Sequence, residues 1–121
     1  MAVLLDIALV TLGDPHELRR AIINLVANAL DATPRGGHVV VRCAVAGDTI
    51  TIAVEDDGYG IAPERRASLF ERFGGGHFRG GAGLGLYIVR RIVEKHGGSV
   101  AYAPHEPQGS RFTITLPMVR G

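Results

Sequence analysis

Two asparagines, Asn24 and Asn28, are the first residues whose type and spacing suggest chemistry. They lie four positions apart among apolar residues with helical spacing, so they should share one face of a helix. Asparagine is a poorer helix former than alanine, by up to ~0.7 kcal/mol, and two together suggest a use. An amide oxygen is a hard, neutral ligand that can help to hold Mg²⁺ against phosphate oxygens. A solvated polar face is the competing interpretation of the pair alone.

An aspartate and two glycines, Asp56-x-Gly58-x-Gly60, follow an expected strand. A carboxylate at a strand end can accept a hydrogen bond from an exocyclic amine such as that of adenine. The glycines would let a ligand approach the backbone. Asp57 is a second candidate, and because alternate strand residues point to opposite sides, only one of the two carboxylates should face a pocket. An ordinary acidic turn remains the alternative.

A glycine-rich run, Gly81-x-Gly83-x-Gly85, precedes an expected helix. Backbone amides of such a loop and of a helix N-terminus form an anion site. The run does not fit a dinucleotide fingerprint, because it follows no strand, and no Lys-Ser/Thr pair follows it as in a Walker A loop. Within residues 74–81, His77 and Arg79 are the side chains able to donate to a phosphate.

The elements that must position these residues can be read from periodicity and from turn residues. Asp14-Pro15 and Glu17 predict the start of a long helix, which residues 33–37 end. We further expect one or two strands in residues 3–12, an antiparallel hairpin from strands 38–46 and 49–55, a short helix over 63–72, a helix over 83–96 ended by glycines, and strands over 99–103 and 111–116. This order predicts an α+β sandwich with helices on one face of a mixed sheet.

The composition bounds the class of protein. The 121 residues fit one domain, and 46% are hydrophobic, so a packed core is expected. A net charge of +1 gives no argument for nucleic acid or for a membrane surface, and no apolar run is long enough to span a bilayer. The one cysteine, Cys43, is expected in the core. We therefore predict a cytoplasmic domain with neither nucleic-acid nor membrane contacts.

The order and spacing of the motifs is more specific than any one of them. Over roughly residues 10–117 the sequence resembles the catalytic ATP-binding domain of sensor histidine kinases, within the gyrase/Hsp90/histidine-kinase/MutL superfamily. The segments that resemble its N, G1, F, G2 and G3 boxes are Asn24-Leu25-x-x-Asn28-Ala29, Asp56-x-Gly58-x-Gly60-Ile61, Leu69-Phe70-Glu71-Arg72-Phe73, Gly81-Ala82-Gly83-Leu84-Gly85-Leu86 and Gly109-Ser110-x-Phe112.

The resemblance implies a two-layer α+β sandwich, the Bergerat ATP-binding fold, with about five strands in a mixed sheet and about three helices. ATP and Mg²⁺ are the implied cofactors, with Asn24 and Asn28 as catalytic residues and Asn28 on the metal. Asp56 would bind the adenine amine. The implied nucleotide-binding set is Asn24, Asn28, Asp56, Gly58, Gly60, Ile61, Phe73, Gly81, Gly83, Leu84, Gly85, Leu86 and Ser110.

The implied activity is transfer of the ATP γ-phosphoryl group to a histidine on a separate helical dimerisation domain, with a response regulator as an indirect partner. Residues 1–121 would then be a single catalytic domain without that acceptor hairpin. Two departures from the family pattern stand out: the lid between Phe73 and Gly81 is short and rich in glycine, and Asp31 stands where many relatives place a basic residue.

Three alternatives share the fold. Protein-serine kinases of the anti-sigma type and ATP-hydrolysing clamps carry a glutamate where this sequence has Asn24, so Asn24 favours the histidine kinase. In the clamps that glutamate is the general base for water. The third alternative is a regulatory domain that binds ATP without transferring phosphate.

Overall fold

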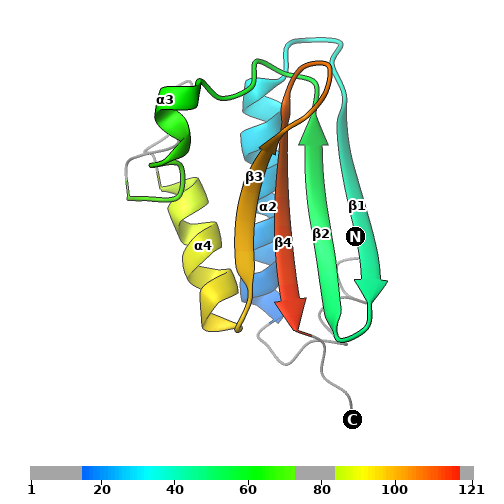
Figure 1. The fold of residues 1–121 in the computed structure, drawn as a ribbon, viewed down its shortest axis with the longest axis vertical. Helices are drawn as coiled ribbons and strands as arrows, with labels where there is room; N and C mark the ends of the chain where they lie inside the picture. Colours follow the sequence, from blue (N-terminus) through cyan, green and yellow to red (C-terminus); the bar gives the residue numbers. More distant parts are fainter. Residues whose placement is uncertain (1–14, 73–83, 118–121) are drawn as a thin grey trace.

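The structure is a computed structural model that describes residues 15–72 and 84–117. These residues form a two-layer sandwich. Helices cover one face of a four-stranded sheet (Figure 1). The elements are α2 (Pro15–Ala32), β1 (Val39–Ala46), β2 (Thr49–Asp56), α3 (Pro63–Arg66), α4 (Gly85–Lys95), β3 (Ser99–Pro104) and β4 (Ser110–Pro117). The predicted α+β class is confirmed.

The sheet has the order β1-β2-β4-β3, and the three pairings are all antiparallel. The predicted hairpin is confirmed: Val39 pairs with Asp56, and Ala46 pairs with Thr49 across a turn at Gly47. In the next pairing Asp56 lies opposite Ser110. The sheet is one strand smaller than expected and contains no parallel pair among the described residues. The strand expected in residues 3–12 lies outside them.

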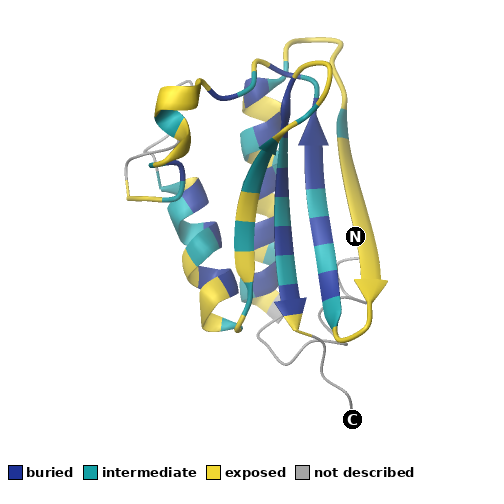
Figure 2. Cartoon of the chain, in the orientation of Figure 1, coloured by how far each residue is buried: buried dark blue, intermediate teal, exposed yellow. Residues whose placement is uncertain are grey.

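The core lies between the sheet and the two long helices (Figure 2). Alternate residues of the central strands face the helices, as the period of two in a strand requires. On α2 and α4 the buried residues recur every three or four positions. The core-forming side chains are Leu18, Ile22, Leu25 and Ala29 of α2, Ile50, Ile52 and Val54 of β2, Leu86, Val89, Ile92 and Val93 of α4, and Phe112, Ile114 and Leu116 of β4.

The first strand corrects one expectation. Cys43, predicted to be a core residue, is exposed. Its neighbours on the same side of the strand, Val41 and Val45, are exposed as well. Strand β1 lies at the edge of the described sheet, whereas α2 packs mainly over β2, and α4 packs over β3 and β4 (Figure 2). The apolar composition of this segment therefore predicted a strand correctly, but it did not predict that the strand is exposed.

The short helix is shorter than the predicted 63–72. Helix α3 spans only Pro63–Arg66, and the chain then continues in turns. The amides of Ser68, Leu69 and Glu71 each bond to the carbonyl three residues earlier. These tighter turns bury Leu69 and set the ring of Phe70 edge-on against Phe112, with centroids 6.0 Å apart.

Helix α4 ends as its glycines predict. Gly97 has a φ of +79°, which a residue with a side chain rarely adopts. The Gly98 amide then turns back and donates to the Val93 carbonyl at 2.8 Å. This pattern satisfies carbonyls that the end of a helix leaves free. It also directs the chain straight into β3.

We expect Phe112→Ala to lower the free energy of unfolding by about 3–5 kcal/mol, as for other fully buried aromatics. Phe112 is fully buried and contacts the rings of Phe70 and Tyr102. Urea denaturation measures the loss, and Val45→Ala, at a side chain 64% exposed, is the control that should change it little. Equal effects of the two substitutions would contradict this account of the core.

Candidate functional site

Several of the predicted site residues meet at one end of the sheet. Strand β2 ends at Asp56, β4 begins opposite it at Ser110, and α2 ends nearby at Ala32 (Figure 1). The Tyr59 amide donates to the Ala32 carbonyl at 3.1 Å and so ties the loop after β2 to α2. The motifs that begin at Asp56 and at Gly109 lie about fifty residues apart in the chain and are adjacent in the fold because β2 and β4 pair.

Asp56 is the polar centre of this end. Its residue is only 1% exposed, and its Oδ1 accepts a hydrogen bond from the Gly58 amide at 2.9 Å. The second oxygen, Oδ2, is buried and has no hydrogen-bond partner among the described residues. Unsatisfied buried carboxylate oxygens are destabilising and uncommon in folded proteins. Oδ2 is therefore an acceptor that a donor of a ligand would satisfy.

Burial raises the pKa of Asp56 above its ordinary value, because desolvation disfavours the charged form. The amides of Gly58 and Ser110 oppose this rise, and the nearby negative charge of Asp57 adds to it. Ser110 is itself buried at 2% exposure. The Gly58 amide makes the hydrogen bond to this carboxylate, and no ion pair of Asp56 is found within residues 15–72 and 84–117.

Asp57, the alternative candidate, points elsewhere. Its Oδ1 accepts from the His38 amide at 2.8 Å, and its Oδ2 lies 3.2 Å from His38 Nδ1. These bonds to His38 lower the pKa of Asp57. The expectation that only one of the two carboxylates would face inward is consistent with this geometry, and Asp56 is the buried one.

Glu55 is a charged residue that the sequence reasoning did not single out. It lies on the opposite face of β2 from Asp56 and is nearly buried, with Arg42 Nε 2.6 Å from its Oε1. Arg111 and His105 approach Oε2 at 3.5 and 4.0 Å. The hydrogen bond from Arg42 is the main cause that lowers the pKa of Glu55. Strand alternation from the apolar Ile52 and Val54 could have indicated its orientation, but not its partners.

Close backbone approaches require glycine at two positions of this site. A Cβ on Gly58 would overlap the carbonyl oxygen of Ala32, and one on Gly109 would overlap the backbone of Asp56. Gly109 also has a φ of +120°. At position 60 a side chain would have space, so glycine is favoured there only because of its φ of +74°. Ile61 follows as a core residue, 6% exposed.

Asn24 and Asn28 lie on α2, both half-buried, away from the core-facing stripe. No hydrogen bond of either side-chain amide group is found within residues 15–72 and 84–117. Ala32 continues the same face one turn beyond Asn28, and Ala32 is the residue that contacts the loop after β2. Helix α2 therefore carries the Asn24 and Asn28 side chains on the face that Ala32 continues toward the loop after β2.

The phosphate motif is only partly described. Leu84 and Gly85 form the first turn of α4, where the Leu84 carbonyl accepts from Ile88 at 2.8 Å. The first amides of a helix have no partner inside it. Leu86 is buried in the core, so its side chain has a packing role. The predicted residues Phe73, Gly81 and Gly83, together with His77 and Arg79, lie outside the described part of the chain.

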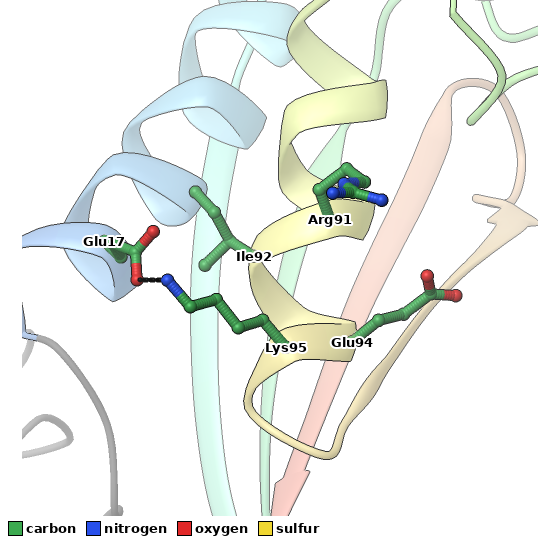
Figure 3. Close-up of a pocket in the computed structure, with 5 residues that line it drawn as sticks. All are labelled: Glu17, Arg91, Ile92, Glu94 and Lys95. Carbon is green, nitrogen blue, oxygen red and sulfur yellow. Dashed lines mark hydrogen bonds and ion pairs between the residues drawn. The ribbon is translucent and has the colours of Figure 1, made fainter.

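A separate depression of about 470 Å³ lies at the opposite end of the two long helices. It is lined by Glu17, Arg91, Ile92, Glu94 and Lys95, and Lys95 reaches across from α4 to Glu17 of α2 at 3.0 Å (Figure 3). Its lining mixes both charges around one isoleucine. None of the predicted site residues contributes to it.

Two further results concern metals and membranes. In the described residues no group of three or more His, Cys, Asp or Glu side chains could hold a metal ion. A Mg²⁺ at Asn28 does not need such a group, because Mg²⁺ often binds through one or two protein oxygens, water and substrate phosphates. No helix within those residues has the length and apolar character needed to cross a bilayer.

Residues 13–120 match the family described as histidine kinase-, DNA gyrase B-, and HSP90-like ATPase. The sensor histidine kinase CusS of Escherichia coli strain K12 is 46% identical over 110 residues, which are 87% of this chain and 23% of CusS. The chain thus spans about a quarter of that relative.

Solved structures agree with this likeness. The mycobacterial sensor histidine kinase MprB superposes with a TM-score of 0.76 at 38% identity, over 92% of this chain and 76% of that one. Full-length ShkA in complex with AMPPNP superposes with a TM-score of 0.76 at 35% identity, over 89% of this chain and 23% of ShkA.

The neighbouring carboxylates Glu55 and Asp56 should affect stability with opposite signs. The pKa of Glu55 is lowered in the fold, so its contribution is present above its unfolded pKa of about 4.3 and is lost as the pH falls. The pKa of Asp56 is raised, so its ionisation destabilises the fold as the pH rises.

We therefore expect Glu55→Gln to lower the free energy of unfolding at pH 7 by about 1 kcal/mol, because its main partner Arg42 is largely exposed. Asp56→Asn should leave the nucleotide-free domain no less stable than the wild type. The Asp56→Asn difference should shrink as the pH falls toward 4, because the raised pKa of Asp56 lies above its ordinary value. The Glu55→Gln difference should shrink only as the pH falls below about 4.3, toward the lowered pKa of Glu55. A loss of stability in Asp56→Asn as large as that in Glu55→Gln would contradict a raised pKa of Asp56 beside a lowered pKa of Glu55.

Proposed function

The chain belongs to the histidine kinase-, DNA gyrase B- and HSP90-like ATPases, as a catalytic ATP-binding domain of the sensor histidine kinase type, and from this premise we propose how it acts. It binds Mg-ATP and donates the γ-phosphoryl group to a histidine on a separate helical domain in two-component signalling. The observation that carries the proposal is the buried Oδ2 of Asp56, which has no hydrogen-bond partner within residues 15–72 and 84–117. We also propose that it acts in the cytoplasm, where ATP is available.

Adenine recognition is assigned to the end of β2. The Gly58 amide occupies Oδ1 of Asp56, which leaves Oδ2 as the acceptor for the exocyclic amine of the base. Because Oδ2 is buried without a partner among the described residues, that amine would supply a missing hydrogen bond. Gly58, Gly60 and Ile61 would shape the base pocket, with Ser110 beside the carboxylate.

Phosphate binding is assigned to α2 and the start of α4. The amide oxygen of Asn28 suits Mg²⁺, and Asn24 lies one turn away on the same face. Mg²⁺, when bound, would neutralise charge on the phosphates. The amides of the first turn of α4, with Gly81 and Gly83 before it, would donate to phosphate oxygens, aided by the helix dipole. Phe73 and Leu86 complete the proposed set.

The reaction requires little covalent chemistry from this domain. The acceptor nitrogen of a histidine forms a bond to the γ-phosphorus, the bond from that phosphorus to the β,γ-bridging oxygen breaks, and ADP leaves. Catalysis of such a transfer rests on alignment and on charge neutralisation. The acceptor would come from another domain, consistent with the small share of CusS that this chain matches.

Asn24 favours transfer to a protein over ATP hydrolysis. An amide is not basic, so Asn24 cannot serve as the general base that an ATP-hydrolysing clamp needs to activate water. We therefore expect hydrolysis by the domain to be slow. A serine-kinase activity and a purely regulatory binding role are the competing functions.

Asp56→Asn should alter which base the domain prefers. The Gly58 amide needs an acceptor, so the new side chain should turn its oxygen to Gly58 and present its NH₂ group to the pocket. Two donors would then face each other at the adenine amine, whereas the 6-carbonyl of hypoxanthine would be accepted. We expect ATP affinity to fall about 5- to 150-fold, which corresponds to about 1–3 kcal/mol, and ITP affinity to fall less or to rise.

Binding can be measured by titration calorimetry with Mg²⁺ present, and by the rise in melting temperature that native-state binding causes. Asp57→Asn is the matched control, since Asp57 bonds to His38 and should leave the ATP-to-ITP ratio unchanged. If millimolar Mg-ATP produced no thermal shift in the wild type, the proposal of ATP binding would fail. An altered ratio in Asp57→Asn alone would move the base contact to that residue.

Transfer itself can be tested with γ-labelled ATP and a purified histidine-bearing dimerisation domain of a sensor kinase. We expect label on that domain that is lost in acid and kept in base, as for phosphohistidine. Asn28→Ala should reduce labelling at least tenfold, because the Mg²⁺ ligand is lost. Acid-stable label would favour a serine kinase, and ATP binding without any label would favour the regulatory role.

A further inference from the structure

Gln108 makes a contact that none of the sequence motifs indicated. It lies in the loop between β3 and β4, and its Nε2 donates to the Gly58 carbonyl at 2.9 Å. The bond joins residues fifty positions apart in the chain. It is a side-chain hydrogen bond from an exposed residue directly to the loop that carries the proposed base pocket.

The Gln108 bond completes the restraint of one peptide group. The Gly58 carbonyl and the Tyr59 amide belong to the same peptide, and that amide donates to the Ala32 carbonyl at 3.1 Å. The peptide is therefore held by α2 on its N–H side and by Gln108 on its C=O side. Glycine offers no side chain to limit its own φ and ψ, so such outside restraints determine its conformation.

The restraint reaches the carboxylate of Asp56 through one residue. The amide on the other side of the Gly58 Cα donates to Asp56 Oδ1 at 2.9 Å. A rotation of Gly58 that released its carbonyl from Gln108 would therefore also disturb the bond that orients the carboxylate. Gly109 packs directly against the backbone of Asp56, which keeps Gln108 in reach of Gly58.

We propose that Gln108 is a positioning residue for adenine recognition: it fixes the Gly58 peptide, and through it the direction in which Asp56 presents Oδ2. This inference rests on the proposed function of Asp56. Gln108 acts on the base and not on the phosphates, since its contact is with Gly58.

Two substitutions at Gln108 distinguish the effect of losing the hydrogen-bond donor from the effect of changing the shape of the side chain. Gln108→Glu is nearly isosteric but places a carboxylate oxygen against the Gly58 carbonyl, so we expect ATP to bind about tenfold more weakly. Gln108→Lys restores a donor, and its ATP affinity should lie within about threefold of the wild type. Glu106→Gln, at an exposed residue of the same loop, is the control for a change of charge there.

The decisive readout compares ATP with purine riboside triphosphate, which lacks the 6-amine. Gln108→Glu should weaken ATP binding several-fold more than binding of this analogue. Misfolding, or a changed charge near the phosphates, would weaken both nucleotides alike, so the ratio decides even if the variant is less stable. Equal losses for the two nucleotides, or no loss of ATP affinity in Gln108→Glu, would overturn the inference. Failure of the wild type to bind ATP would instead overturn the proposed function.

Discussion

Two backbone contacts that leave no room for a side chain hold the Asp56 end of the molecule together. Gly58 lies against the Ala32 carbonyl, and Gly109 lies against the backbone of Asp56. These contacts bring helix α2, the end of β2 and the β3–β4 loop to one place, and the hydrogen bonds of Tyr59 and Gln108 form around them. A methyl group at either glycine would separate elements whose spacing the proposed pocket depends on.

The same packing explains how a carboxylate can be kept in a poor environment. Asp56 is buried and carries a raised pKa, while Glu55 beside it has a lowered one because arginines surround it on the other face of the sheet. Glu55 thus forms ion pairs with arginines, whereas Oδ2 of Asp56 has no partner among the described residues. Polar groups left in this condition often mark functional sites, where stability is reduced for the sake of binding.

Much of the fold was predictable because the patterns were strong and local. The helical spacing of Leu18, Ile22 and Leu25, and the paired glycines after α4, predicted elements that the structure contains. Cys43 was predicted wrongly because a strand's composition does not state whether a helix covers it. Helix α3 was overestimated because the tertiary contacts of Leu69 and Phe70, which replace helical turns, cannot be read from local sequence.

The site was predictable to a different degree. The residues alone left the choice between Asp56 and Asp57 open, and the family resemblance favoured Asp56. In the structure Asp56 is buried, whereas Asp57 bonds to His38, a residue about twenty positions away. Glu55 and Gln108 were not indicated, since their partners depend on strand pairing and on a loop contact fifty residues distant. The assignment of nucleotide contacts to Asn24, Asn28 and the glycine-rich run stays a prediction.

Helix α2 runs unbroken from Pro15 to Ala32, and this continuity has a thermodynamic consequence. Asn28, beside the proposed phosphates, and Ala32, which holds the base loop, are one turn apart on a rigid rod. A displacement of the helix at one of these residues is transmitted to the other. Occupancy of the two halves of the proposed pocket would then be linked, and the linkage would be reciprocal: the free energy by which a bound triphosphate changes the affinity for the base equals that by which the base changes the affinity for the triphosphate.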